Sequence, residues 1–208
     1  MAGLRERKRE STRRSIWHSA LQMFAERGYD NVTIEEIADY CAVSPRTIFR
    51  YFGTKEDVLF AGTEARRMLL LHAIETQPPG GGAFRVLERA CRTVAEDYVP
   101  DLELMRTRAR IIEASPALQP RNAGLPEQWD GDVLLLLRKS GRAAGMTDLE
   151  LRLLVGASMS ALRICIEEWI RTEQDLLALI GAAFEHLGRG LAGKQPPAAN
   201  RAHWSISW

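Results

Sequence analysis

Three helix-start signals lie close together near the beginning of this sequence, at Thr33, Ser44 and Thr54. Thr33 and Thr54 are each followed three residues later by an acidic residue, the spacing of a capping box, and Ser44 is followed by a proline, which suits the first turn of a helix. Helices that begin so near one another have only about two to three turns each. This part of the chain must therefore fold into small helices joined by tight turns.

Helical apolar spacing continues through the rest of the chain. Ile16, Ala20 and Phe24 fall on one helical face, and Gly28 is a natural C-cap for that first helix. Beyond the short helices, longer ones separated by Pro- and Gly-rich segments are predicted at about 55–76, 83–98, 102–114, 126–144, 147–171 and 174–191. No stretch alternates convincingly between apolar and polar residues, so the predicted fold class is all-α, with about nine helices.

The segment 32–55 has the spacing of a helix-turn-helix. Its apolar residues can form a small core between two short helices and the helix before them, and Cys41–Ser44 supplies the turn. In such a unit the second helix protrudes, and its N-terminal half can enter the major groove of DNA. Its exposed side would carry Arg46, Thr47 and Arg50, which are side chains able to read guanine edges or thymine methyl groups.

The charge balance excludes a protein that coats nucleic acid uniformly, because 28 Lys and Arg residues nearly cancel 27 Asp and Glu residues. Basic residues are nevertheless concentrated in two places. Residues 1–14 hold six basic residues against two acidic ones, and residues 44–55 hold three basic residues and no acidic one. Tyr51 and Lys55, at the end of the second segment, are placed to hold phosphates. One basic face on a neutral protein favours site-specific binding of DNA.

A longer pattern includes this segment. It runs from Arg14 through Phe24–Tyr29, Thr33–Ala38, Val43–Ser44 and Thr47–Phe52 to Lys55–Leu59. These residues resemble the TetR family of bacterial transcriptional regulators. The resemblance implies a three-helix DNA-binding domain at 1–54 with a basic N-terminal arm at 1–14, an effector-binding and dimerisation domain at 55–192, and a tail at 193–208. It also implies a double-stranded DNA operator with two-fold symmetry.

The resemblance further implies which residues contact DNA, either at bases or along the phosphates. The expected set is Thr33, Ser44, Pro45, Arg46, Thr47, Phe49, Arg50, Tyr51 and Lys55. Two positions depart from the family pattern. Phe49 stands where a tyrosine is common, so a hydroxyl contact to phosphate is lost there. Ala42 stands where the turn usually has a glycine, so Ala42 is expected to adopt a strained turn conformation.

The second half of the chain carries a weaker likeness. The segments Arg108–Leu118 and Leu149–Trp169 resemble a subgroup of the family with an acyl-CoA-like effector domain, typified by mycofactocin-system regulators. A pocket is then expected among the fourth to eighth helices, with Met68, Leu71, Phe84, Leu87, Cys91, Met105, Trp129, Met159 and Arg163 as candidate lining residues. Plain core packing is the alternative explanation for each. Arg106 or Arg110 could meet an acidic ligand head, or could simply be solvated.

The helix predicted at 147–171 is apolar on almost every side. Such a helix must be covered by its own domain on one side and by another surface on the other. Small residues such as Gly156 and Ala157 permit close approach of a neighbouring helix, and the helix at 174–191 is also rich in apolar residues. Two helices from each of two subunits would form a four-helix bundle, and the resulting homodimer would match a palindromic operator.

Enzyme chemistry has no support in the sequence. No histidine has a glutamate three residues before it, so the Glu-x-x-His pattern of helical carboxylate metal sites is absent. Gly188–Lys194 begins like a phosphate-binding loop, but Gln195 replaces the required Ser or Thr. Cys41, Cys91 and Cys165 have neither metal-binding nor disulfide spacing. We therefore expect no catalytic residue, no metal site and no cofactor.

The expected function is that of a ligand-responsive, dimeric DNA-binding regulator, a repressor released from its operator by a small hydrophobic or acyl-type effector. The helix at 55–76 would couple the two sites, because it starts at the DNA-binding domain and ends beside the expected pocket. The alternative is a helical protein-interaction module without sequence-specific DNA binding, which would have no reason to keep Arg46, Arg50 and Lys55 together. No signal peptide or membrane span is evident, so a cytoplasmic protein without a membrane partner is expected.

Overall fold

The computed structural model describes residues 2–78 and 82–190, so the tail at 193–208 lies outside the described residues. Within these ranges the chain forms nine α-helices and two short 3-10 helices, and no strand, which confirms the all-α prediction. The α-helices are α1 (Ala2–Arg27), α2 (Ile34–Tyr40), α3 (Pro45–Tyr51), α4 (Lys55–Glu75), α5 (Ala83–Tyr98), α6 (Leu102–Ala114), α7 (Gln119–Lys139), α8 (Asp148–Thr172) and α9 (Leu176–Arg189). The 3-10 helices η1 (Val99–Asp101) and η2 (Pro116–Leu118) precede α6 and α7.

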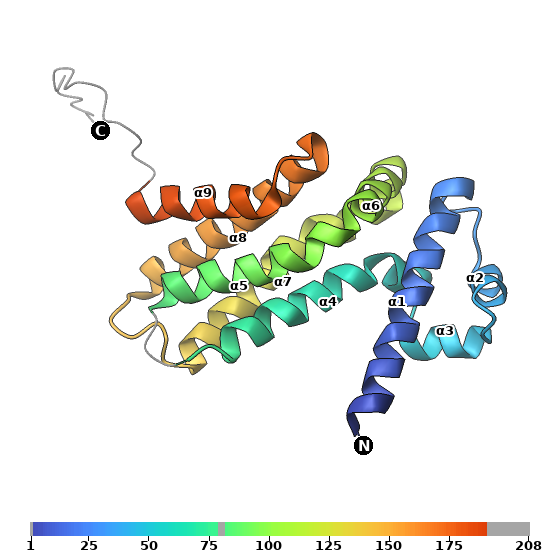
Figure 1. The fold of residues 1–208 in the computed structure, drawn as a ribbon, viewed down its shortest axis with the longest axis horizontal. Helices are drawn as coiled ribbons and strands as arrows, with labels where there is room; N and C mark the ends of the chain where they lie inside the picture. The colour runs from blue at the N-terminus through green and yellow to red at the C-terminus, as the bar shows by residue number, and fades with distance from the viewer. Residues whose placement is uncertain (1, 79–81, 191–208) are drawn as a thin grey trace, which may run out of the picture.

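The helices form two groups (Figure 1). Helices α1 to α3 make a small unit at one end of the molecule, and α4 to α9 make a longer bundle in which α9 is the outermost helix on the side away from α4. Helix α1 crosses the end of the bundle and packs against α4 and α6. The residues expected to form the basic N-terminal arm are helical from Ala2 onward, so they continue α1 rather than forming a separate segment.

The predicted helix starts are confirmed by their hydrogen bonds. Thr33 and Glu36 form a complete capping box, in which the Thr33 hydroxyl accepts from the Glu36 amide at 3.2 Å and the Glu36 carboxylate accepts from the Thr33 amide at 2.8 Å. The hydroxyls of Ser44 and Thr54 each accept a backbone amide three residues ahead, at 3.1 Å. Caps of this kind stabilise a helix by about 1 kcal/mol each, which matters for helices as short as α2 and α3.

The turn between α2 and α3 sets the position of the protruding helix. Ala42 has a φ of 52°, the left-handed conformation that glycine adopts without cost, so the strain expected at this position is confirmed. The turn is closed by the Val43 amide, which donates to the Ala38 carbonyl at 2.9 Å. Ile37 and Ile48 are fully buried, and α2 packs against both α1 and α3.

One helix has different bounds in the structure from those predicted. The helix expected at 126–144 is α7, which begins at Gln119 and ends at Lys139. Pro120 fits the first turn of α7, where no amide donor is needed, and Pro126 lies inside the helix. The C-terminal limit moves earlier because Gly141 and Gly145 both have positive φ, at 68° and 82°. The proline-rich segment that was expected to be a loop is therefore mostly helical.

Candidate nucleic-acid interface

Helix α3 presents unpaired basic side chains on its outer face. Ile48 is buried and fixes the inner face of α3, whereas Arg46 and Arg50 are exposed. Neither arginine forms an ion pair with any residue that the structure describes, and Thr47 is half-buried beside them. A short helix with free guanidinium groups on one side is what direct readout of guanine edges requires. The structure thus places three predicted base-reading residues together on one surface.

The aromatic residues of α3 divide between the surface and the interior. Phe49 is 50% exposed, although it has no polar group to hold a phosphate. Tyr51 is half-buried, with its ring 6.2 Å from that of Phe52 and the Arg50 guanidinium 5.5 Å from its centroid. Arg50 and Tyr51 therefore form one surface unit, in which the phenol limits the positions that the arginine can adopt.

Other residues predicted to contact phosphate lie at helix starts. Thr33 is exposed at the start of α2, and Ser44 is exposed at the start of α3, where its hydroxyl lies 2.9 Å from that of Thr47. Pro45 follows in the first turn and is half-buried. Helix N-termini attract anions because their first amides are unpaired and the helix dipole is positive there.

Lys55 has partners within the protein. Its ammonium group donates to the carbonyls of Tyr29 and Val32 at 2.8 and 2.9 Å and lies 4.2 Å from the centre of the Tyr29 ring. These contacts join the first residue of α4 to the loop between α1 and α2. The contact of Lys55 with phosphate, implied by the family resemblance, stays a prediction.

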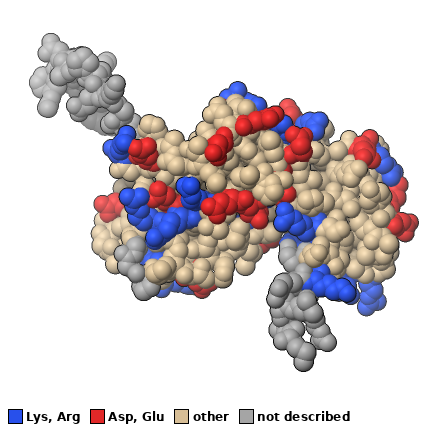
Figure 2. Space-filling view, in the orientation of Figure 1, with Lys and Arg blue, Asp and Glu red and all other residues tan. Residues whose placement is uncertain are grey.

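Charge is distributed unevenly over the α1–α3 unit. Lys and Arg side chains lie along its lower edge in Figure 2, below α3, whereas Asp and Glu side chains gather on the side formed by α2. Lys8 and Arg9 extend the basic surface along α1, and Glu35 and Asp39 are exposed on α2. The surface that carries α3 is therefore the one suited to a polyanion.

The nine residues expected to line an effector pocket differ in their burial, and their role as pocket residues stays a prediction. Leu87, Cys91, Met105 and Met159 are buried, Leu71, Phe84 and Trp129 are partly buried, and Met68 and Arg163 are exposed. Arg163 pairs with Glu167 on its own helix at 3.1 Å.

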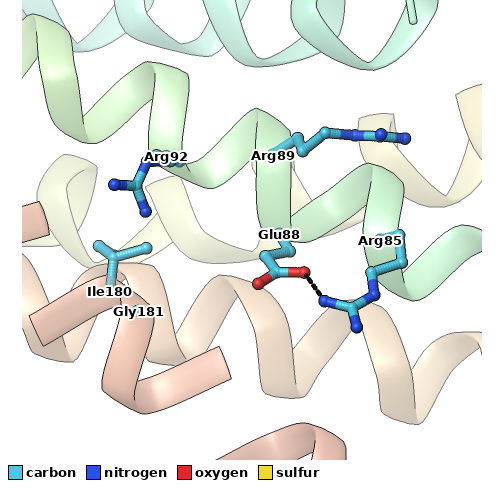
Figure 3. A pocket seen from close by; sticks show the side chains of 6 residues that line it. All are labelled: Arg85, Glu88, Arg89, Arg92, Ile180 and Gly181. Atoms are coloured by element: carbon cyan, nitrogen blue, oxygen red, sulfur yellow. Dashed lines mark hydrogen bonds and ion pairs between the residues drawn. The ribbon is translucent and has the colours of Figure 1, made fainter. Parts of the chain in front are cut away.

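A surface groove of about 400 Å³ lies between α5 and α9 (Figure 3). It is lined by Arg85, Glu88, Arg89, Arg92, Ile180 and Gly181, none of which was predicted. Its basic residues are partnered, because Arg85 pairs with Glu88 at 2.7 Å and Arg89 donates to Gln77 at 2.6 Å.

Arginines of α6 separate into paired and unpaired groups. Arg106 pairs with Glu103 and Glu173 at 2.8 Å, so it is not available to a ligand head in this structure. Arg110 is exposed. Arg108, which the sequence did not single out, has no carboxylate partner among the described residues, and its Nε is enclosed without a hydrogen bond. Only the three-dimensional arrangement distinguishes Arg108 from its neighbours.

Comparison with known proteins identifies the family. Residues 16–61 match "Bacterial regulatory proteins, tetR family", and residues 83–192 match "MftR C-terminal domain". The chain is 30% identical over 190 residues to the HTH-type transcriptional regulator TcmR of Streptomyces glaucescens, covering 88% of this chain and 84% of that protein. The chain therefore belongs to the TetR family of DNA-binding transcriptional regulators, and within it to the members with an MftR-type C-terminal domain.

Solved structures support the same fold. The fatty acid degradation regulator FadR from Bacillus halodurans superposes with a TM-score of 0.62 at 21% identity, covering 88% of this chain and 96% of that one. FadR from Bacillus subtilis, solved in complex with stearoyl-CoA, gives 0.59 at 19% identity, covering 83% and 95%. Within the described residues, no helix combines the length and apolar character needed to cross a membrane.

Proposed function

We propose that this regulator is a homodimeric repressor that binds a palindromic operator through α3 and leaves it when a small hydrophobic or acyl-type effector binds among α4 to α8. The observation that carries the DNA-binding part is the exposed pair Arg46 and Arg50 on α3, both without ion-pair partners among the described residues. The protein acts in the cytoplasm, by binding rather than by catalysis.

An uncovered apolar stripe on α8 supports the dimer. Leu149, Leu153 and Ile164 are 67%, 63% and 55% exposed, and their spacing puts them on one face of the helix. Exposed large apolar residues in a row mark an interaction surface. Ala178 and Ala182 are exposed on α9, so a second copy of this chain can approach α9 closely. A two-fold axis through this surface would pair two copies of α3 with two half-sites.

The route from effector to operator runs through α4. The first residue of α4, Lys55, is bound to the α1–α2 loop, and Arg66, further along α4, contacts both Asp97 and Asp101 in the effector half. A ligand releases DNA only if it binds the DNA-free arrangement more tightly than the DNA-bound one. A shift of α4 would change the separation of the two recognition helices.

The test is selection of bound sequences from random duplex DNA with the purified full chain, followed by titration at two salt concentrations. Enrichment of a two-fold symmetric site, lost in Arg46→Ala but retained in the control Arg85→Ala, at an exposed arginine of α5, would support sequence-specific readout. Binding that is weak, salt-sensitive and without enrichment would contradict the proposal and favour the protein-interaction alternative.

A further inference from the structure

Arg108 on α6 is a half-buried cation that has no carboxylate partner among the described residues. Its side chain is partly exposed as a whole, but Nε has no access to solvent and no hydrogen-bond partner. The described polar contact is from Nη2 to the Asn122 side-chain oxygen on α7, at 3.3 Å. A neutral amide at that distance does not compensate a full positive charge, and buried charges in proteins are ordinarily paired.

The neighbouring buried arginine makes the contrast clear. Arg66 on α4 is 2% exposed, and it donates to the carboxylates of Asp97 and Asp101 at 2.9 and 2.6 Å. Arg108 has no such carboxylate. Burial, opposed by Tyr98 and reinforced by the nearby Arg66 cation, lowers the pKa of Arg108 to about 10. Among the described residues, Arg66 therefore has carboxylate partners and Arg108 has none.

The surroundings of Arg108 are apolar and come from several helices. Its guanidinium lies 4.9 Å from the centre of the Phe60 ring on α4, which is 2% exposed. Met105 and Ile112, on the same face of α6 as Arg108, are buried. A molecule that reaches the guanidinium would therefore meet the Arg108 cation, and Arg121 over the same Phe60 ring, beside hydrophobic side chains.

From this arrangement we infer that Arg108 is the anchor for a carboxylate, so that the effector is an apolar monocarboxylic acid rather than a neutral thioester or amide. A planar carboxylate can accept two parallel hydrogen bonds from a guanidinium, including one from the Nε that now has none. The inference rests on the proposed function, since it assigns the ligand class of the proposed effector site.

The same anchor connects to the DNA-binding unit. Arg121 on α7 lies over the same Phe60 ring, at 4.8 Å, and pairs with Asp57 in the first turn of α4 at 2.7 Å. A carboxylate held by Arg108 would attract the Arg121 guanidinium as well. Drawing Arg121 away from Asp57 would release the start of α4 from α7, and this is the end of α4 that leads into α3.

The test compares decanoate with decanamide, which has the same chain and no charge. Binding to the full chain is measured by isothermal titration calorimetry for wild type, Arg108→Met and the matched control Arg110→Met on the same helix. We expect decanoate to bind wild type and Arg110→Met equally, and Arg108→Met at least about tenfold more weakly. Decanamide should bind wild type at least about tenfold more weakly than decanoate.

If Arg108 had a structural role, Arg108→Met would lower the melting temperature. The proposed ligand-binding role predicts otherwise. Replacing an unpaired buried charge with a residue of similar volume should leave the melting temperature unchanged or raise it. If Arg108→Met does not fold, Arg108→Gln serves as the second variant. Equal affinity of decanoate in wild type and Arg108→Met, equal affinity of decanoate and decanamide, or no binding of decanoate to wild type would each overturn the inference.

Operator release is scored separately by fluorescence anisotropy with the selected DNA site. Binding of decanoate through Arg108 without release would leave the carboxylate site standing and would count against the effector part of the proposed function. Release by decanoate that persists in Arg108→Met would support the proposed function and overturn the assignment of Arg108.

Discussion

Trp17 of α1 packs directly against Gly62 of α4, so closely that a Cβ atom on Gly62 would lie 2.3 Å from the Trp17 ring. No side chain other than hydrogen fits there without moving the indole or separating the helices. Trp17 is 4% exposed, and Arg66 lies 5.9 Å from its ring. The Trp17–Gly62 contact between the DNA-binding unit and the bundle is therefore close-packed.

Gly62→Ala tests this contact. The added methyl group overlaps the Trp17 ring, so we expect a loss of about 1–3 kcal/mol in the free energy of unfolding, measured with urea. Gly131→Ala is the control, because a Cβ at this helical position meets nothing within 4 Å. That substitution should be neutral or stabilise by up to about 1 kcal/mol. Equal stability of the two variants would contradict the contact.

Ala42→Gly should stabilise the protein. Glycine adopts the φ of 52° without the steric cost that alanine has, and the gain is reduced by the greater freedom of glycine in the unfolded chain. We expect a net gain of about 0.5–1 kcal/mol in the free energy of unfolding. The same change at Ala109, exposed inside α6, should cost about 1 kcal/mol. A loss of stability in Ala42→Gly would contradict the inference that Ala42 adopts a strained conformation.

Asp101→Asn should lower the stability of the contact between α1 and the bundle and should also change operator binding. Asp101 is 5% exposed and accepts from Arg66 at 2.6 Å and from Arg14 of α1 at 3.2 Å. Removing its charge leaves Arg66 undercompensated, at a cost of about 3 kcal/mol in the free energy of unfolding. Asp97→Asn, where the carboxylate is 39% exposed, should cost less. Thermal melts of both variants, followed by operator titration, provide the measurement.

Glu36 makes the free energy of unfolding depend on pH, and the direction of its pKa shift fixes the sign of that dependence. The hydrogen bond from Arg27, followed by that from the Thr33 amide, lowers the pKa of Glu36 from 4.5 to about 2. Because the folded-state pKa is depressed, the stabilisation is present above about pH 4.5 and is lost as the pH falls towards 2. The stability difference between wild type and Glu36→Gln should therefore narrow on acidification.

Glu35→Gln is the control for that measurement, because the exposed Glu35 side chain has no hydrogen bond or ion pair among the described residues. Urea titrations at pH 6, 4 and 3 compare the three proteins, these pH values being about the range over which a carboxylate titrates. A difference between wild type and Glu36→Gln that stays constant over this range would show that the capping box does not act through the ionised carboxylate.

Leu153→Asp should dissociate the dimer. The charge would lie on the apolar stripe of α8, where it would be desolvated in the proposed interface. Sedimentation velocity should then report a monomer, and affinity for a two-fold symmetric operator should fall by at least about tenfold. Leu135→Asp on α7 is the control, since Leu135 is 50% exposed but lies on a different helix. A dimeric Leu153→Asp protein would place the interface elsewhere.

Local signals allowed most helix starts to be predicted, whereas interior sites depended on packing. The caps at Thr33, Ser44 and Thr54 involve residues three apart, so short-range spacing was sufficient. The start of α7 was missed because Pro126 was interpreted as a helix limit, although tertiary packing keeps it inside the helix.

The candidate pocket illustrates a different limit of prediction from sequence. Helical spacing identifies Leu87 and Cys91 as inward-facing, but it cannot distinguish a core residue from one that lines a cavity, and both are fully buried. Arg108 was missed for a related reason. Among the described residues no carboxylate pairs with Arg108, and this becomes evident only once α4, α6 and α7 are packed together.

The contact between Trp17 and Gly62 also affects how regulators of this type can be recombined. A chimera that joins the first 54 residues of one family member to the remainder of another keeps the peptide chain continuous but brings together two surfaces that did not evolve together. Any recipient with a side chain at the position of Gly62 would hold the incoming α1 away from α4. Transplanting this DNA-binding unit should therefore succeed only when the glycine is transplanted with it.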